Sequence, residues 1–295
     1  MNSNARAYLL LTMTALCWGG NAVLGRLAVG EISPMLLVSA RWLGVLILIG
    51  FFANRYIRTD WRILRRHLPY VGAMGALGLT AFNALFYVAA YTTTAINIGI
   101  IQGAIPVFVL IGAFLAYRTK ITLMQLSGVL LTMLGVAFVA SKGTLERLAT
   151  LSISQGDGLM VIACALYAGY VVGLFKRPAV SSMALFTAVA GSAFLASIPL
   201  VAVEATLGRL QWPSYAGWVI VALVTLFPSF LAQIFFIRGV ELIGPGRAGI
   251  FVNLVPVFAS ILAVALIGES FERFHAIALG AVLGGIWLSE RGKLK

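Results

Sequence analysis

Charged residues are scarce in this chain of 295 amino acids: only 10% are charged, while 61% are hydrophobic. Soluble domains are about 25% charged and about 45–50% apolar. Acidic residues are the scarcest, with nine Asp and Glu against 21 Lys and Arg. The composition therefore excludes an ordinary water-soluble domain and predicts a membrane protein.

Cysteine and histidine are almost absent, with two of each. Cys17 and Cys164 fall inside hydrophobic runs, and His67 and His275 stand near the ends of such runs. These residues are too few for a disulfide framework or a metal cluster. An intramembrane enzyme would also need a nucleophile with a base, and the hydrophobic runs hold no such pair. The sequence predicts a protein that is not an enzyme and carries no metal or cofactor.

Long hydrophobic runs without charged residues make up most of the sequence. A helix crosses roughly 30 Å of hydrocarbon with about 20 apolar residues, and every backbone polar group in lipid needs a partner in its own segment. The sequence therefore predicts an all-α, polytopic membrane protein. Its ten transmembrane helices are expected at residues 7–29, 34–53, 69–91, 95–117, 121–140, 156–175, 180–203, 214–238, 245–267 and 271–289.

The basic residues are unevenly distributed among the predicted loops. If the N-terminus is cytoplasmic, most of the 21 Lys and Arg fall in cytoplasmic segments, many of them within residues 54–67. The positive-inside rule then places both termini in the cytoplasm, and we expect a multi-pass protein of a bacterial inner membrane. Within this segment Ile57, Trp61 and Leu64 share one helical face, which predicts a short helix lying on the lipid surface.

The chain resembles itself at an offset of 148 to 150 residues. Ile105-Pro106-Val107-Phe108 recurs as Val255-Pro256-Val257-Phe258, and Asn83 corresponds to Gln233. This register predicts two repeats, residues 1–145 and 146–295, with five helices each. An odd number of helices inverts the second repeat in the membrane, and inverted repeats are typical of alternating-access transporters.

Polar and aromatic side chains inside the predicted spans mark candidate substrate contacts. Amides avoid lipid and face another helix or a cavity, while aromatic rings far from the span ends suit a pocket. Asn83, Tyr87 and Tyr91 recur every four residues on one face of the third span. The predicted substrate-binding residues, each of which also has helix packing as an alternative role, are Trp18, Asn21, Asn83, Tyr87, Tyr91, Gln102, Tyr167, Tyr170, Gln233 and Asn253.

Pro106 and Pro256 occupy matching positions in the fourth and ninth spans. Each removes a backbone N–H and clashes with the carbonyl four residues earlier, so we expect each to bend its helix. Two interpretations stay open, namely paired hinges for transport and static kinks tolerated in a membrane.

Arg41 stands about two turns inside the second span, roughly 10 Å from its start. Either its side chain snorkels to the outer surface, or it is a gate that pairs with Glu31 or with a substrate carboxylate. No Asp or Glu stands clearly mid-span, so the sequence favours no built-in proton relay.

Three segments form a recognisable combination: Ala15 to Asn21 (ALCWGGN), Ala90 to Thr94, and Gly268-Glu269 followed by Gly280 to Gly285 (GAVLGG). Together they resemble the drug/metabolite transporter superfamily, in particular its EamA-type ten-helix members. The chain is most similar to YddG-type amino-acid exporters. The resemblance implies a ten-helix basket whose central cavity is lined by spans 1, 3, 4, 6, 8 and 9.

The resemblance also implies a functional acidic position. It is carried over to Glu269 alone, because the first repeat has Arg118-Thr119 where the second has Gly268-Glu269.

These features predict a transporter that exports small metabolites, with neutral and aromatic amino acids as the expected class. Its partners are the small-molecule substrate and the lipid bilayer, without nucleic acid. A multidrug or other metabolite carrier is the alternative within the same superfamily. The oligomeric state stays open.

Overall fold

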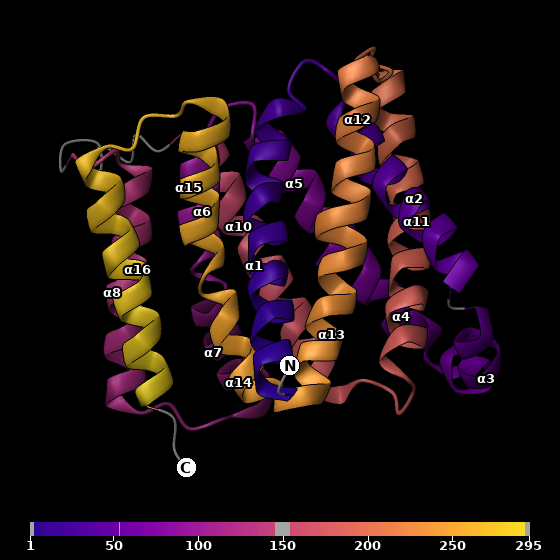
Figure 1. Ribbon diagram of the computed structural model, residues 1–295, viewed down its shortest axis with the longest axis horizontal. Coiled ribbons are helices and arrows are strands. Elements are labelled where there is room, and N and C mark those ends of the chain that lie inside the picture. Colours follow the sequence, from indigo (N-terminus) through magenta and orange to yellow (C-terminus); the bar gives the residue numbers. More distant parts are fainter. Residues whose placement is uncertain (1–2, 53, 145–153, 293–295) are drawn as a thin grey trace.

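The protein was analysed as a computed structural model in which residues 3–52, 54–144 and 154–292 are described. Regular structure within these ranges is entirely helical (Figure 1). The predicted boundary between the repeats, at residues 145 and 146, lies outside the described residues.

Each of the ten predicted spans coincides with one helix or with helices stacked end to end. Spans 1 to 5 are α1 (Ser3–Leu27), α2 (Pro34–Phe52), α4–η2–α5 (Leu68–Ala73, Met74–Ala81, Phe82–Ala89), α6–α7 (Ala95–Gln102, Ile105–Tyr117) and α8 (Leu123–Ala140). Spans 6 to 10 are α10 (Gln155–Gly173) with η3 (Leu174–Lys176), α11 (Ser182–Thr206), α12–η4–α13 (Tyr215–Val224, Thr225–Leu231, Ala232–Ile243), α14–α15 (Pro245–Val252, Val255–Ile267) and α16 (Arg273–Arg291). The predicted surface helix is α3 (Asn54–Leu64), followed by η1 (Arg65–His67).

Length and apolarity support a membrane location for most of these segments. In the described part of the chain, eight helical segments are long and apolar enough to cross a bilayer, and Pro34–Gly50 is a shorter apolar helix. The tenth helix, α16, packs along α8, where the two backbones approach closely. A side chain on Gly285 would collide with Thr132 and with the carbonyl of Gly128, so glycine is required at this crossing.

The two repeats run in opposite directions through the structure. Arg26, in the last turn of α1, donates to the carbonyl of Ala90 (2.6 Å). Thr93, three residues later, donates to Asp157 in the first turn of α10 (2.5 Å). The first helix of the first repeat therefore ends where the first helix of the second repeat begins, as inversion requires.

Two pairs of matching spans depart from regular α-helix. Spans 4 and 9 are interrupted, and Pro106 and Pro256 stand in the first turn of the helix after each interruption. They therefore begin a new helix, where a missing N–H costs nothing, rather than bend a continuous one as expected. Spans 3 and 8 each contain a π-helix, η2 and η4, that the sequence analysis did not predict.

The helices at the centre of the protein come from both repeats. In Figure 1, α8 and α16 form one end of the molecule, α2, α11 and α12 lie toward the other, and α1 stands between them. α1 packs against α13 and α15, and α10 packs against α5 and α7. α2 also packs against η4, and the buried polar side chains described next join these helices of the two repeats.

Candidate functional site

Arg41 lies at the centre of a buried hydrogen-bonded network that joins the two repeats. Its side chain is only 4% exposed. Nη1 donates to Oδ1 of Asn83 (2.5 Å) and to the hydroxyl of Tyr87 (2.6 Å). Nε and Nη2 both donate to Oγ of Ser229 (2.8 and 2.6 Å). Tyr87 donates in turn to Oδ1 of Asn21 (3.2 Å), so residues of α1, α2, α5 and η4 form one cluster.

The partners of Arg41 lie in or beside the two π-helices. Asn83 is the second residue of α5, which follows η2, and its amide donates to the carbonyl of Leu79 inside η2 (2.6 Å). Ser229 lies within η4 and donates to the carbonyl of Val224 (2.5 Å). The i to i+5 pattern leaves carbonyl groups available to side chains, and such segments are frequent at functional sites. The sequence analysis missed Ser229, for which the neighbouring Pro228 inside a span was the available signal.

The charge of Arg41 is buried without an opposite charge. Its hydrogen-bond partners Asn83, Tyr87 and Ser229 are neutral. The ion pair found among the described residues, Arg238 with Glu241, lies at the surface instead. Arg41 does not snorkel to the surface, and it does not pair with Glu31, which accepts from the hydroxyl of Ser214. The snorkelling interpretation and the Glu31 pair are wrong for this structure because Asn83, Tyr87 and Ser229 hold the guanidinium inside the helix bundle. Contact with a substrate carboxylate stays a prediction.

The predicted aromatic residues of α1 and α10 contact residues of the other repeat. Trp18 donates its indole N–H to a carbonyl of η4 (3.1 Å), and its ring centre is 5.4 Å from that of Phe236. The ring of Tyr167 is 4.9 Å from Phe82 and 5.5 Å from Tyr170. Trp18, Tyr167 and Tyr170 keep part of their surface exposed, although they stand far from the helix ends.

The other predicted contacts are more scattered. Gln102, Gln233 and Asn253 are partly exposed, and Asn253 ends α14 at the interruption of span 9. Tyr91 was expected on the face of span 3 that carries Tyr87, but it lies in the turn after α5 and is 42% exposed. A single cavity shared by all ten residues stays a prediction.

Carboxylates of one repeat accept hydrogen bonds from backbone N–H groups at helix N-termini of the other repeat. Glu269 accepts from the backbone N–H groups of Ala95 and Ile96 at the start of α6 (2.8 and 2.9 Å). The free N–H groups and the dipole of a helix start favour an anion there. This contact agrees with the choice of Glu269 as a functional acid, but its gating role stays a prediction.

The N-termini of α2 and α11 are each capped by an acidic side chain of the other repeat. Glu204 accepts from the N–H groups of Met35 and Leu36 at the start of α2 (both 3.2 Å). Asp60 accepts from the N–H and hydroxyl of Ser181 at the start of α11 (2.9 and 2.8 Å). These contacts tie the ends of the repeats together.

The end of the molecule near α6 is more tightly packed than the end near α14. Residues 95–101 of α6 are all buried. Of the described side chains of α14, by contrast, Ala248 is buried and the others are partly or fully exposed. α14 has no side-chain hydrogen bond at its N-cap. Thr119 stands where an acid equivalent to Glu269 would be. Among the described residues this carboxylate cap is observed on α6 and not on α14.

A second buried polar cluster was missed by the sequence analysis. Asp157 is completely buried and accepts from the hydroxyl of Thr93 (2.5 Å) and the amide of Asn97 (3.2 Å). Oδ1 of Asn97 lies 3.2 Å from Nε2 of His275. Nδ1 of His275 accepts the backbone N–H of Glu272. Asp157 was not predicted and His275 was considered only as a metal ligand, because each stands near the end of a hydrophobic run.

Comparisons with known proteins agree with this architecture. The sequence profile of the EamA-like transporter family matches the chain twice, at residues 5–141 and 154–291. A solved crystal structure has the same fold, with a TM-score of 0.65 at 18% identity over 97% of both chains.

Several curated transporters are similar along nearly the whole chain. The uncharacterized transporter YyaM of Bacillus subtilis is 28% identical over 287 residues, covering 95% of this chain and 92% of its own. An uncharacterized transporter of Archaeoglobus fulgidus is 26% identical over 291 residues, with 97% and 98% covered. The uncharacterized inner membrane transporter YedA of Escherichia coli is 24% identical over 278 residues, with 94% and 88% covered. The two profile matches and the repeated ten-helix architecture together establish that the chain belongs to the EamA-like transporter family.

Proposed function

We propose that this membrane transporter exports small metabolites that carry a carboxylate, with neutral and aromatic amino acids as the first class to test. The observation that carries the proposal is the buried cation of Arg41, which is held by neutral oxygens at the contact between repeats. A buried charge without a counterion costs several kcal/mol. A substrate carboxylate would supply the missing charge and would bind a guanidinium in two-point geometry.

The surroundings of Arg41 suit an amphipathic substrate. Asn21, Asn83 and Tyr87 offer hydrogen-bonding groups in the network of Arg41. The ring of Tyr167 packs on Phe82, the neighbour of Asn83 in sequence, and would offer an apolar face. Small-molecule sites combine an apolar lining with a few polar groups that orient the ligand. The resemblance to YddG-type exporters supports the same substrate class.

The inverted repeats and the unequal packing of their ends support alternating access as the mechanism. The capped, buried α6 belongs to the closed end of this conformation, and the less covered α14 belongs to the end that opens. The interruptions at Pro106 and Pro256 would serve as hinges between the two conformations.

The proposed orientation places both termini and α3 in the cytoplasm, so that the closed end faces outward. The arginines of α3 and η1 support this orientation through the positive-inside rule. Similarity to the inner membrane transporter YedA supports an inner membrane location.

The aromatic pair Tyr167 and Tyr170 also favours a second candidate, a carrier of apolar cations or drugs, because π faces attract cations. Counterflow in proteoliposomes distinguishes the two candidates. Labelled leucine and phenylalanine should exchange, whereas the amines that lack their carboxylate should not. Exchange of the amines at equal rates would contradict carboxylate recognition and favour the second candidate.

A further inference from the structure

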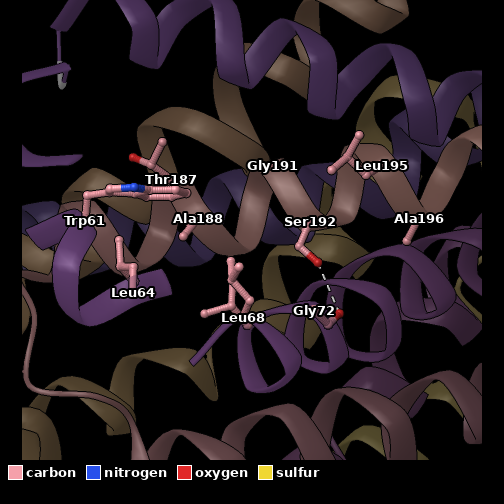
Figure 2. A pocket seen from close by; sticks show the side chains of 11 residues that line it. Trp61, Leu64, Leu68, Gly72, Thr187, Ala188, Gly191, Ser192, Leu195 and Ala196 are labelled. Carbon is pink, nitrogen blue, oxygen red and sulfur yellow. Dashed lines mark hydrogen bonds between the residues drawn. The ribbon is translucent and has the colours of Figure 1, made fainter. Parts of the chain in front are cut away.

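We propose that a groove between α3, α4 and α11 binds one anionic phospholipid of the cytoplasmic leaflet. The groove has a volume of about 580 Å³ and is lined almost entirely by apolar groups. Figure 2 shows Trp61, Leu64 and Leu68 on one side of it, with Ala188, Gly191 and Leu195 of α11 opposite. The proposal rests on the proposed orientation for the leaflet, but not on the substrate.

Small residues keep the groove open. A side chain built on Gly72 would meet no atom within 4 Å, and the nearest atom to one built on Gly191 is Cδ2 of Leu46 at 3.9 Å. Gly72 and Ser192 also hold the two walls together, because the Ser192 hydroxyl donates to the Gly72 carbonyl (3.1 Å, Figure 2). The space is therefore not closed by tight backbone packing, and a flexible apolar chain fits it.

The length of the groove matches one leaflet. Its lining on α11 runs from Thr187 to Ala196, which is about 14 Å along the helix at its usual rise. Half of the hydrocarbon thickness of a bilayer is roughly 15 Å. An acyl chain that starts at the membrane surface would therefore occupy the groove to its end.

The residues at the surface end point to an anionic headgroup. Arg65 directly follows the lining residue Leu64 and precedes Leu68, so it stands in sequence at the end of the groove where α3 gives way to α4. Arg62, Arg65 and Arg66 are exposed, and the described residues place no carboxylate in an ion pair with them. The nearby Asp60 is already occupied by the start of α11.

Native mass spectrometry of the full-length protein in detergent tests the proposal with phosphatidylglycerol and phosphatidylcholine of identical acyl chains. Each basic residue near an anionic surface contributes about a fivefold preference. We expect the wild type to retain phosphatidylglycerol preferentially, and Arg65→Gln to lower that preference about fivefold without affecting phosphatidylcholine. Gly191→Leu fills the groove and should remove one bound lipid of either type.

Matched controls separate groove binding from general effects. Arg291→Gln removes an exposed arginine elsewhere, and Gly280→Leu adds the same bulk to an exposed site with open space. Both should bind lipid as the wild type does, and inorganic phosphate should not displace phosphatidylglycerol. Equal retention of the two lipids by the wild type, displacement by phosphate, or Arg65→Gln and Gly191→Leu variants that match the controls would overturn the proposal. Transport is not measured, so failure here leaves the proposed substrate class untouched.

Discussion

Replacing Arg41 by methionine removes the buried charge while keeping a long side chain in the same space. Arg41 donates four hydrogen bonds to Asn83, Tyr87 and Ser229. Hydrogen bonds to a charged group contribute about 1.5–3 kcal/mol each. Burial of the ion opposes this gain by several kcal/mol, so we expect the free energy of unfolding to change by no more than about 2 kcal/mol.

Transport should fall even though the variant stays folded. If Arg41 binds the substrate carboxylate, its loss removes one charge-assisted contact of about 1.5–3 kcal/mol, which lowers apparent affinity by about 10- to 150-fold. Arg41→Lys keeps the charge but loses the planar two-point geometry, so its affinity should fall between those of the wild type and Arg41→Met.

Counterflow of labelled phenylalanine in proteoliposomes, measured over a range of substrate concentrations, gives the apparent affinity. Thermal unfolding in detergent checks that each variant is folded. Arg273→Gln, which alters an exposed arginine, is the control and should behave as the wild type does. A folded Arg41→Met variant that exchanges phenylalanine with wild-type affinity would refute a substrate-binding role.

Four further predictions address other parts of the protein. Glu269→Gln weakens the cap of α6 by about 0.3–1 kcal/mol, so hydrogen exchange of residues 95–102 should become faster; unchanged protection would exclude Glu269 from closure. Gly285→Ala forces the α8–α16 backbones apart and should cost about 1–3 kcal/mol in thermal unfolding, whereas Gly280→Ala, which has open space, should cost nothing measurable. A cysteine at the exposed Ser270 should react with an impermeant reagent added to intact cells, and lack of reaction would contradict the proposed orientation. Counterflow should continue without an imposed pH gradient, and an absolute requirement for one would implicate the buried Asp157 cluster.

The spans could be predicted from the sequence because a transmembrane helix requires only a run of successive apolar residues. A segment crosses a bilayer when about 20 successive residues are apolar, whatever the rest of the chain does. The same holds for the repeats, since an offset such as that between Pro106 and Pro256 is visible without knowledge of contacts. The π-helices were not predicted, because a shift from i+4 to i+5 hydrogen bonding leaves no clear pattern in an all-apolar run.

The partners of each polar side chain were decided by tertiary structure. Arg41 and Ser229 are 188 residues apart in sequence, and only the packing of α2 against η4 brings them within 2.8 Å. The sequence by itself therefore determined a polytopic, internally repeated helical protein and a short set of polar residues that lipid would not accept. Tertiary packing decided that Asn83 and Tyr87 surround a buried arginine and that Tyr91 does not, because the direction of a side chain between apolar helices depends on its neighbours across the bundle.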